Sequence, residues 1–153
     1  VRLLLQHGAL PDHPGKHGLT PLQLAVMKGH LGLTRLLLLE NCNPNTTNPV
    51  TGRSSLYTAV QKGHYSIARL LVQAGASVWR ERWIYNGEYA RIVNPTSELA
   101  GWLDRLSRKP LSLRHMCRVS VRRRLGTGSI SDKVEKIDYP APLKQFLLLK
   151  TDQ

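Results

Sequence analysis

The sequence is short of the groups that most catalytic, metal-binding and membrane-spanning proteins need. Its 153 residues include only two cysteines, Cys42 and Cys117, which lie far apart and in unlike surroundings. No Cys/His spacing is typical of a zinc site, and no His–Asp constellation accompanies Cys117. No apolar run approaches the roughly 18 residues that a membrane helix requires. We therefore expect no catalytic residue, no metal, no cofactor and no membrane partner.

Two isolated thiols are typical of a reducing compartment, which predicts a cytoplasmic protein and leaves the nucleus open. Acidic residues are also scarce, with 10 Asp and Glu against 22 Lys and Arg, for a formal net charge of +12. Such a charge favours acidic partners, nucleic acid included, at least non-specifically. The hydrophobic share of 41% is that of a folded chain, and the length suits one or two small domains.

What the sequence has in abundance is internal repetition. Residues 18–25 recur as residues 52–59, a shift of 34, and Lys-Gly-His at 28–30 recurs at 62–64 with the same shift. In each unit a capped helix is expected, with Thr20 as the cap and Pro21 in the first turn. A second helix is expected at about residues 31–39, and again at about residues 65–73.

The pattern Thr-Pro-Leu-x-x-Ala, then Gly-His, Leu-Leu and Gly-Ala resembles the ankyrin repeat. The resemblance implies stacked helix pairs with loops on one side. Gln23 and Tyr57 stand where His is usual, and Asn41 stands where Gly is usual, since Asn tolerates the left-handed conformation. Residues 43–52 are expected to connect two repeats, with a role in protein binding as the alternative. The chain opens within the second helix of a unit, so we expect further repeats before it and an exposed apolar patch around Leu3 and Leu4.

Residues 78–109 lack the repeat pattern at the expected shift, and we predict an atypical terminal unit there. Asn94 and Pro95 favour a helix start, and apolar residues follow with helical periodicity. These residues are Leu99, Trp102, Leu103 and Leu106. Trp79, Trp83 and Trp102 lie in the same stretch, which predicts a core plug, with an aromatic ligand cage as the alternative.

Residues 110–121 predict an amphipathic helix. Leu113, Cys117 and Val121 fall at i, i+4 and i+8 and form an apolar edge beside Met116. The other side carries arginines, which we expect to face solvent. They are Arg114, Arg118, Arg122, Arg123 and Arg124. Arg114 and Arg118 also leave a reactive Cys117 thiol as an alternative.

This helix resembles the BC box, the elongin-binding helix of the SOCS box. Residues 137–147 resemble the cullin-5 box that follows it, except that Asp138 stands where Pro is usual. The two motifs stand in this order behind ankyrin repeats, so the chain is similar to the ankyrin repeat and SOCS box family.

The resemblance implies a substrate-recognition adaptor of an elongin B/C–cullin-5 type E3 ubiquitin ligase, which is not itself an enzyme. Leu113 would enter an apolar pocket of elongin C, with Met116, Cys117 and Val121 beside it. A second set of residues would bind cullin-5, which works with a RING partner. This set comprises Ile137, Tyr139, Pro140, Leu143, Phe146 and Leu147. The ankyrin loops would hold a protein substrate, whose ubiquitination leads to its degradation.

The predicted fold class is all-α, an ankyrin-repeat solenoid with a C-terminal three-helix SOCS box. The predicted domains are half a repeat at 1–12, repeats at 13–45 and 46–78, a terminal unit at 79–109 and a SOCS box at 110–149. Three alternatives stay open: a helix at residues 113–121 that packs on the last repeat, a basic tail that binds nucleic acid, and an ankyrin scaffold with a vestigial tail.

Overall fold

A computed structural model of the chain describes residues 7, 10–15, 17–86, 88–94, 96–108, 113–126, 128–137 and 140–148. These residues form helices joined by turns and, within the described ranges, no strand beyond an isolated bridge between Thr47 and Ser54. The predicted all-α class is confirmed. None of the described helices is long and apolar enough to cross a membrane. Leu3 and Leu4, where we expect an apolar patch, lie outside the described residues.

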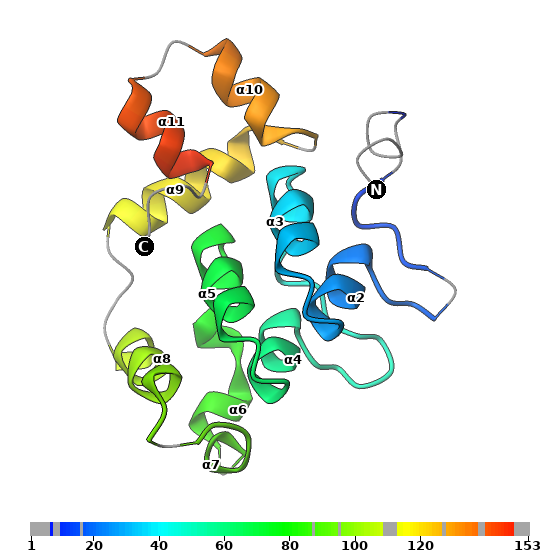
Figure 1. Cartoon of the computed structure of the whole chain (residues 1–153), viewed down its shortest axis with the longest axis vertical. Helices are drawn as coiled ribbons and strands as arrows, with labels where there is room; N and C mark the ends of the chain where they lie inside the picture. Colours follow the sequence, from blue (N-terminus) through cyan, green and yellow to red (C-terminus); the bar gives the residue numbers. More distant parts are fainter. Residues whose placement is uncertain are drawn as a thin grey trace.

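Two consecutive helix pairs form the centre of the molecule. Helices α2 (Pro21–Met27) and α3 (Leu31–Leu39) make the first pair, and α4 (Ser55–Gln61) and α5 (Tyr65–Ala74) make the second. Helix α2 packs on α4 and α3 packs on α5, so the pairs stack side by side (Figure 1). The predicted second helices at residues 31–39 and 65–73 are confirmed, the latter being one residue longer.

The predicted helix start at Thr20 is confirmed, and it explains the unusual Gln23. The Thr20 hydroxyl accepts a hydrogen bond from the backbone N–H of Gln23 (3.3 Å), and the Gln23 side chain accepts one from the Thr20 N–H (2.9 Å). This reciprocal capping box satisfies two N–H groups that the first turn of a helix leaves without partners. Gln23 therefore closes the helix end in place of the usual His.

The terminal unit consists of η1 (Val78–Arg80), α6 (Arg82–Tyr85), α7 (Tyr89–Ile92) and α8 (Glu98–Arg108). Its buried residues repeat those of α5 at a shift of 32 instead of 34. They are Leu99, Ala100 and Leu103, which correspond to Ile67, Ala68 and Leu71. The buried residues of this unit therefore follow those of α5 at a spacing two residues shorter than the shift between the two repeats.

The expected helix start at Asn94 is wrong by three residues. Helix α8 begins at Glu98, and the Ser97 hydroxyl accepts a hydrogen bond from the Ala100 N–H (3.2 Å). Asn94 instead accepts hydrogen bonds from Thr96 in the turn before the helix. The competing turn chemistry of Asn explains the error, because a cap residue also initiates turns.

Trp83 fills the space between the second repeat and the terminal unit. It is buried, lies edge-on to Tyr57 with ring centroids 5.6 Å apart, and stacks on Tyr89 at 6.3 Å. The core plug is confirmed for this residue, and its burial leaves no open aromatic cage around it. Trp102 is half-buried beneath the guanidinium of Arg69, and the side chain of Trp79 lies outside the described part.

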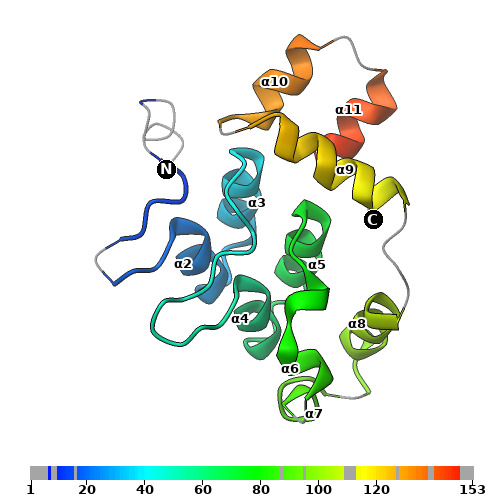
Figure 2. The same ribbon diagram turned by 180° about the vertical axis from the view of Figure 1, so that it is seen from behind.

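The chain ends in a three-helix element: α9 (Leu113–Arg124), α10 (Ile130–Lys136) and α11 (Ala141–Leu147). It has a small core of its own, separate from that of the repeats. This core consists of Ile130, Val134, Leu147 and Leu148. Helix α9 lies across the ends of α3 and α5, with α10 and α11 beyond it (Figure 2). One face of α9 therefore meets the repeats and another carries α11.

Candidate docking helix and its junction with the repeats

Helix α9 leaves an apolar edge uncovered at its N-terminal half. Leu113 is 73% exposed, Met116 is 50% exposed and Cys117 is also exposed. A scattered exposed apolar residue needs no explanation, whereas adjacent ones on one helix edge form an apolar patch that a partner can cover. The structure thus brings together three of the four residues predicted to bind elongin.

Val121, the fourth, has a different environment. It is half-buried and packs with Leu39 and Leu125 against the small core of the C-terminal element. The predicted apolar edge therefore divides after Cys117: its first part is free, and its last residue joins the core.

The opposite side of α9 packs on the end of α5. Gly75 ends α5 with a φ of +108°, and a Cβ on it would lie 3.1 Å from Cγ1 of Val119. That distance is closer than side chains normally approach, so glycine allows both the turn and the close packing of α9. The alternative in which the edge of Leu113, Cys117 and Val121 packs on the last repeat is wrong for Leu113 and Cys117, which are exposed. The contact with the repeats is made by Val119 instead. It does not compete with docking, because the docking edge is another face.

Two of the arginines expected to face solvent are buried instead. Arg118 is 2% exposed and Arg122 is 3% exposed, whereas Arg123 and Arg124 are exposed as expected. The side chain of Arg114 lies outside the described part. Sequence periodicity assigns every polar side chain of an amphipathic helix to water, and it cannot detect that a second element covers that side.

Arg122 joins the repeats to the C-terminal element through both ends of its guanidinium group. Nη1 donates a hydrogen bond to the carbonyl oxygen of Leu147 in α11 (2.9 Å), and Nη2 donates one to the carbonyl oxygen of Leu38 in α3. Burial, followed by the nearby charge of Arg118, lowers the pKa of Arg122 to about 10. The group therefore sits in a position where its charge is costly, and the two carbonyl oxygens compensate part of that cost.

Asn41 makes the reciprocal contact from the end of α3. It has a φ of 62°, as expected for a residue in the place of Gly. Its side-chain amide donates hydrogen bonds to the carbonyl oxygens of Arg122 (3.3 Å) and Gly126. These carbonyls belong to the end of α9, where a helix lacks internal partners for them. The left-handed conformation could be predicted from the sequence, but the partner of the amide could not, because it lies more than 80 residues away.

The predicted cullin-binding residues lie around α11. Pro140 and Leu143 are exposed, and Ile137 is half-buried. Leu147 is fully buried in the C-terminal core, so in this structure it packs the element together and is not on the surface. Tyr139 and Asp138 lie outside the described residues, as does the side chain of Phe146.

Titratable groups do not form a reactive cluster in the described part of the chain. There, no group of three or more His, Cys, Asp or Glu side chains could hold a metal ion. Cys42 is buried, and desolvation, helped by the negative charge of Asp12, raises the pKa of its thiol to about 12. It is a core residue rather than a nucleophile.

The architecture defines a class of protein: stacked helix pairs followed by a small helical element that exposes an apolar edge. Residues 1–82, more than half of the chain, match the ankyrin repeats (3 copies), and residues 109–148 match the SOCS box. The chain belongs to the ankyrin repeat and SOCS box family. These are adaptor-type, non-catalytic domains.

A shorter stretch of this chain is similar to a human protein. Human cyclin-dependent kinase inhibitor 2A is 43% identical to this chain over 51 residues, which is 33% of this chain and 32% of that protein. The chain thus matches about a third of the length of this relative.

Proposed function

We propose that this chain is the substrate-recognition subunit of an elongin B/C–cullin-5 type ubiquitin ligase. In this assembly the repeats bind the protein to be ubiquitinated, the exposed edge of α9 binds elongin C, and the segment before and within α11 binds cullin-5. The chain supplies no nucleophile; it brings a target lysine to the transferase. We propose a cytoplasmic location, in keeping with two unpaired thiols.

One observation carries this proposal: α9 is held on one side and free on the other. Val119 and Arg122 anchor it to the repeats, while Leu113, Met116 and Cys117 remain in water. Covering a fully exposed leucine stabilises a complex by roughly 1.5–3 kcal/mol from buried area. Central anchors often lose more when truncated, because the partner's pocket is then left empty.

Around α11, the assignment of cullin binding rests on two exposed residues. Among the described side chains of the predicted motif, Pro140 and Leu143 are exposed, near each other at the start of the helix. Leu147 contributes indirectly, by holding α11 on the C-terminal core. We therefore assign cullin contact to Pro140 and Leu143 and expect Leu147 to act through stability.

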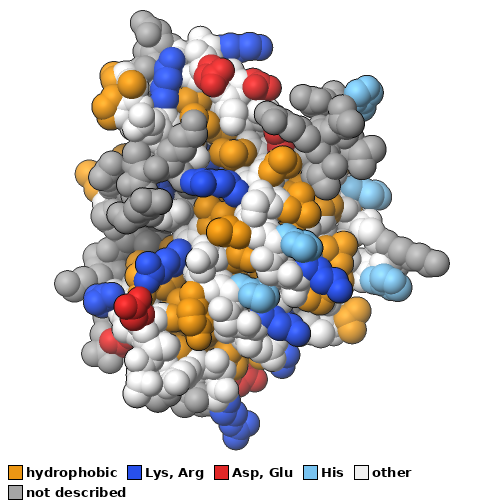
Figure 3. Space-filling view, in the orientation of Figure 1, with side chains coloured by type: hydrophobic (Ala, Val, Ile, Leu, Met, Phe, Trp, Pro, Cys, Tyr) orange, Lys and Arg blue, Asp and Glu red, His pale blue; other side chains and the backbone are white. Residues whose placement is uncertain are grey.

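The repeats offer two features that suit a protein substrate. The loop at residues 43–52 is closed by Asn48, whose side-chain oxygen accepts from the N–H groups of Val50 (2.8 Å) and Thr51 (3.1 Å). Val50 is 84% exposed at its tip. Over the stacked helices, His, Lys and Arg side chains are interspersed with hydrophobic ones (Figure 3). Leu31 and Tyr65, the first residues of α3 and α5, are exposed. A mixed surface of this kind is typical of protein-binding sites.

Nucleic-acid binding by the basic tail is a weaker candidate. It was expected to rest on Arg118, Arg122, Arg123 and Arg124, and the first two are buried. A patch reduced to two exposed arginines has little capacity to neutralise phosphates along a strand.

The test is co-expression with elongins B and C, followed by capture of the complex. The double change Leu113→Ser and Cys117→Ser should abolish capture, because it removes two apolar contacts from the exposed edge. Leu31→Ser is the matched control, since it removes an exposed leucine from the repeats instead and should leave capture unchanged. Equal capture by the double variant and the wild type would contradict the assignment of α9.

A second capture experiment separates the two docking segments. Pro140→Ala with Leu143→Ala should retain elongins B and C and lose cullin-5, because these side chains lie just before α11 and within it, and not on the edge of α9. Retention of cullin-5 by the variant would contradict the assignment of its contact to Pro140 and Leu143. Preference of the wild type for another cullin would exclude cullin-5 as the partner, and either outcome would leave elongin binding intact.

A further inference from the structure

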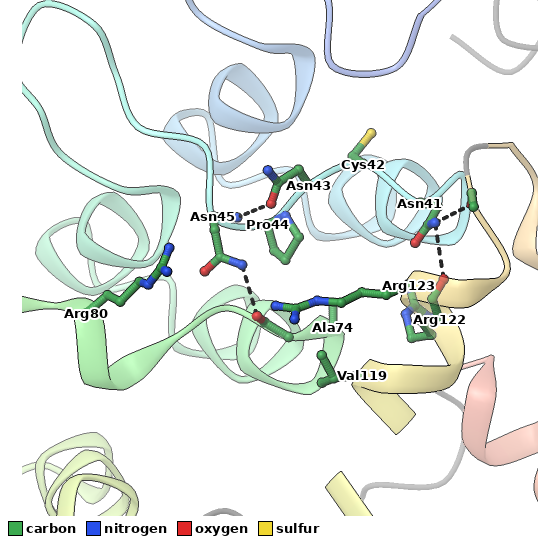
Figure 4. Close-up of a pocket in the computed structure, with 12 residues that line it drawn as sticks. Asn41, Cys42, Asn43, Pro44, Asn45, Ala74, Arg80, Val119, Arg122 and Arg123 are labelled. Atoms are coloured by element: carbon green, nitrogen blue, oxygen red, sulfur yellow. Dashed lines mark hydrogen bonds between the residues drawn. The ribbon is translucent and has the colours of Figure 1, made fainter. Parts of the chain in front are cut away.

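A cleft of about 410 Å³, lined by both polar and apolar side chains, lies where the repeats meet the C-terminal element. Its walls come from the loop after α3, from η1 at the start of the terminal unit, and from α9 (Figure 4). Three arginines and three asparagines line it, and none of its described lining residues is Asp or Glu. These six are Asn41, Asn43, Asn45, Arg80, Arg122 and Arg123.

Two of the arginines have free guanidinium groups. Arg80 and Arg123 are exposed, and within the described part of the chain neither side chain makes an ion pair or hydrogen bond. In Figure 4 their guanidinium groups point toward Asn45 from opposite sides. Arg122 adds a third positive charge from its buried position behind them. Like charges that share a cleft repel each other, and an anion placed between them converts that repulsion into attraction.

The side chains of Asn43 and Asn45 already form hydrogen bonds that fix the wall of the cleft. Asn45 donates to the carbonyl oxygen of Gly75 (3.1 Å) and accepts from the N–H of Ser77 (2.8 Å). Asn43 accepts from the N–H of Asn45 (3.0 Å), and its own N–H donates to the carboxylate of Asp12 outside the cleft. These hydrogen bonds fix the asparagine side chains between the two arginines. The donors of the described lining that remain without a partner include the guanidinium groups of Arg80 and Arg123 and the buried Nε of Arg122.

We propose that this cleft binds a compact anion that carries two or more phosphate groups. Guanidinium groups bind phosphate oxygens in a bidentate fork, and two of them facing each other match an anion with a phosphate at each end. The bound anion joins η1 to α9 and so fixes the C-terminal element on the repeats. Neither elongin nor cullin binding enters this proposal.

The experiment uses the purified full chain with pyrophosphate and tripolyphosphate as probes, at constant ionic strength set with sodium chloride. We expect a saturable rise in melting temperature, because a ligand that binds only the folded state stabilises it. Arg80→Gln and Arg123→Gln should each weaken binding roughly tenfold or more, as expected when a charged donor is lost. Arg123→Lys should weaken it less, because it keeps the charge and loses the fork.

Arg124→Gln is the matched control, since Arg124 is an exposed neighbour on α9 that does not line the cleft. It should bind both probes like the wild type. The proposal is overturned if sodium chloride or inorganic phosphate gives the same rise as the polyphosphates, or if Arg80→Gln and Arg123→Gln bind as the wild type does. The proposal is also overturned if a single-stranded oligonucleotide binds more tightly than tripolyphosphate and if Arg124→Gln weakens oligonucleotide binding as much as Arg80→Gln and Arg123→Gln do. The site is then a general basic surface.

Discussion

The side-chain amide of Asn41 donates a hydrogen bond to the carbonyl oxygen of Arg122, 3.3 Å away, and this contact joins the end of a repeat to the end of α9. Arg122 returns a hydrogen bond to α3 through the carbonyl oxygen of Leu38. One repeat further on, Gly75 occupies the position equivalent to Asn41 and packs under Val119. Consecutive repeat ends thus hold α9 at two points, one polar and one apolar.

Asn41→Gly should separate the amide from the backbone role of this residue. Glycine keeps the left-handed conformation, so only the hydrogen bonds to Arg122 and Gly126 are lost. We expect a loss of about 1–2 kcal/mol in the free energy of unfolding, measured by urea denaturation. Asn41→Ala should lose roughly a further 1–2 kcal/mol, because alanine is strained at a φ of 62°. A glycine variant as stable as the wild type would show that the amide adds nothing.

Arg122→Met should loosen α11 with little change in overall stability. The change removes the hydrogen bonds to Leu38 and Leu147, and it also removes a buried positive charge, so the two effects partly cancel. Amide hydrogen exchange in α11 should become faster while exchange in α4 and α5 stays the same. Arg124→Met, on the same helix but exposed, should leave both regions unchanged.

Gly75→Ala should destabilise the chain more than Gly63→Ala. Both glycines have positive φ, of 108° and 73°, but a Cβ at Gly63 meets open space whereas one at Gly75 meets Val119. The difference between the two losses in thermal stability reports the contact with α9. Val119→Ala combined with Gly75→Ala should recover part of that difference, because it removes the opposing methyl groups. Equal losses from the two glycine changes would argue against close packing at this point.

The two thiols should react very differently with a thiol-specific reagent such as Ellman's reagent. Cys117 is exposed, whereas Cys42 is buried and its pKa is raised to about 12, so at pH 8 very little of it is thiolate. The folded chain should therefore react at one thiol, and the denatured chain at two. Cys117→Ser should leave the folded chain almost unreactive. Fast labelling of Cys42 below pH 9 would show that the core around it opens.

Most features of the repeat could be predicted, because they depend on interactions between residues that are close in the sequence. Thr20 followed by Pro21, and glycines at 29 and 63, mark helix ends through contacts within a few residues. The terminal unit was harder to predict from the sequence, because its buried residues follow those of α5 at a shift that is two residues shorter. In addition, Asn94 accepts hydrogen bonds within a turn and does not cap the helix. Of the docking residues, Leu113, Met116 and Cys117 lie where periodicity puts them, while Val121 and Leu147 pack in the core of the element.

The sequence by itself determined the helices, the repeat and the apolar edge of α9, because capping, glycine conformation and helical periodicity act over one or two turns. Only the tertiary structure decided what covers the other sides of α9. The sequence of α9 predicts that Arg118 and Arg122 face solvent, whereas in the structure α3 and α11 surround them and both are buried. The burial of these side chains depends on elements that are distant in the chain, and the local sequence of α9 does not indicate that those elements pack against it.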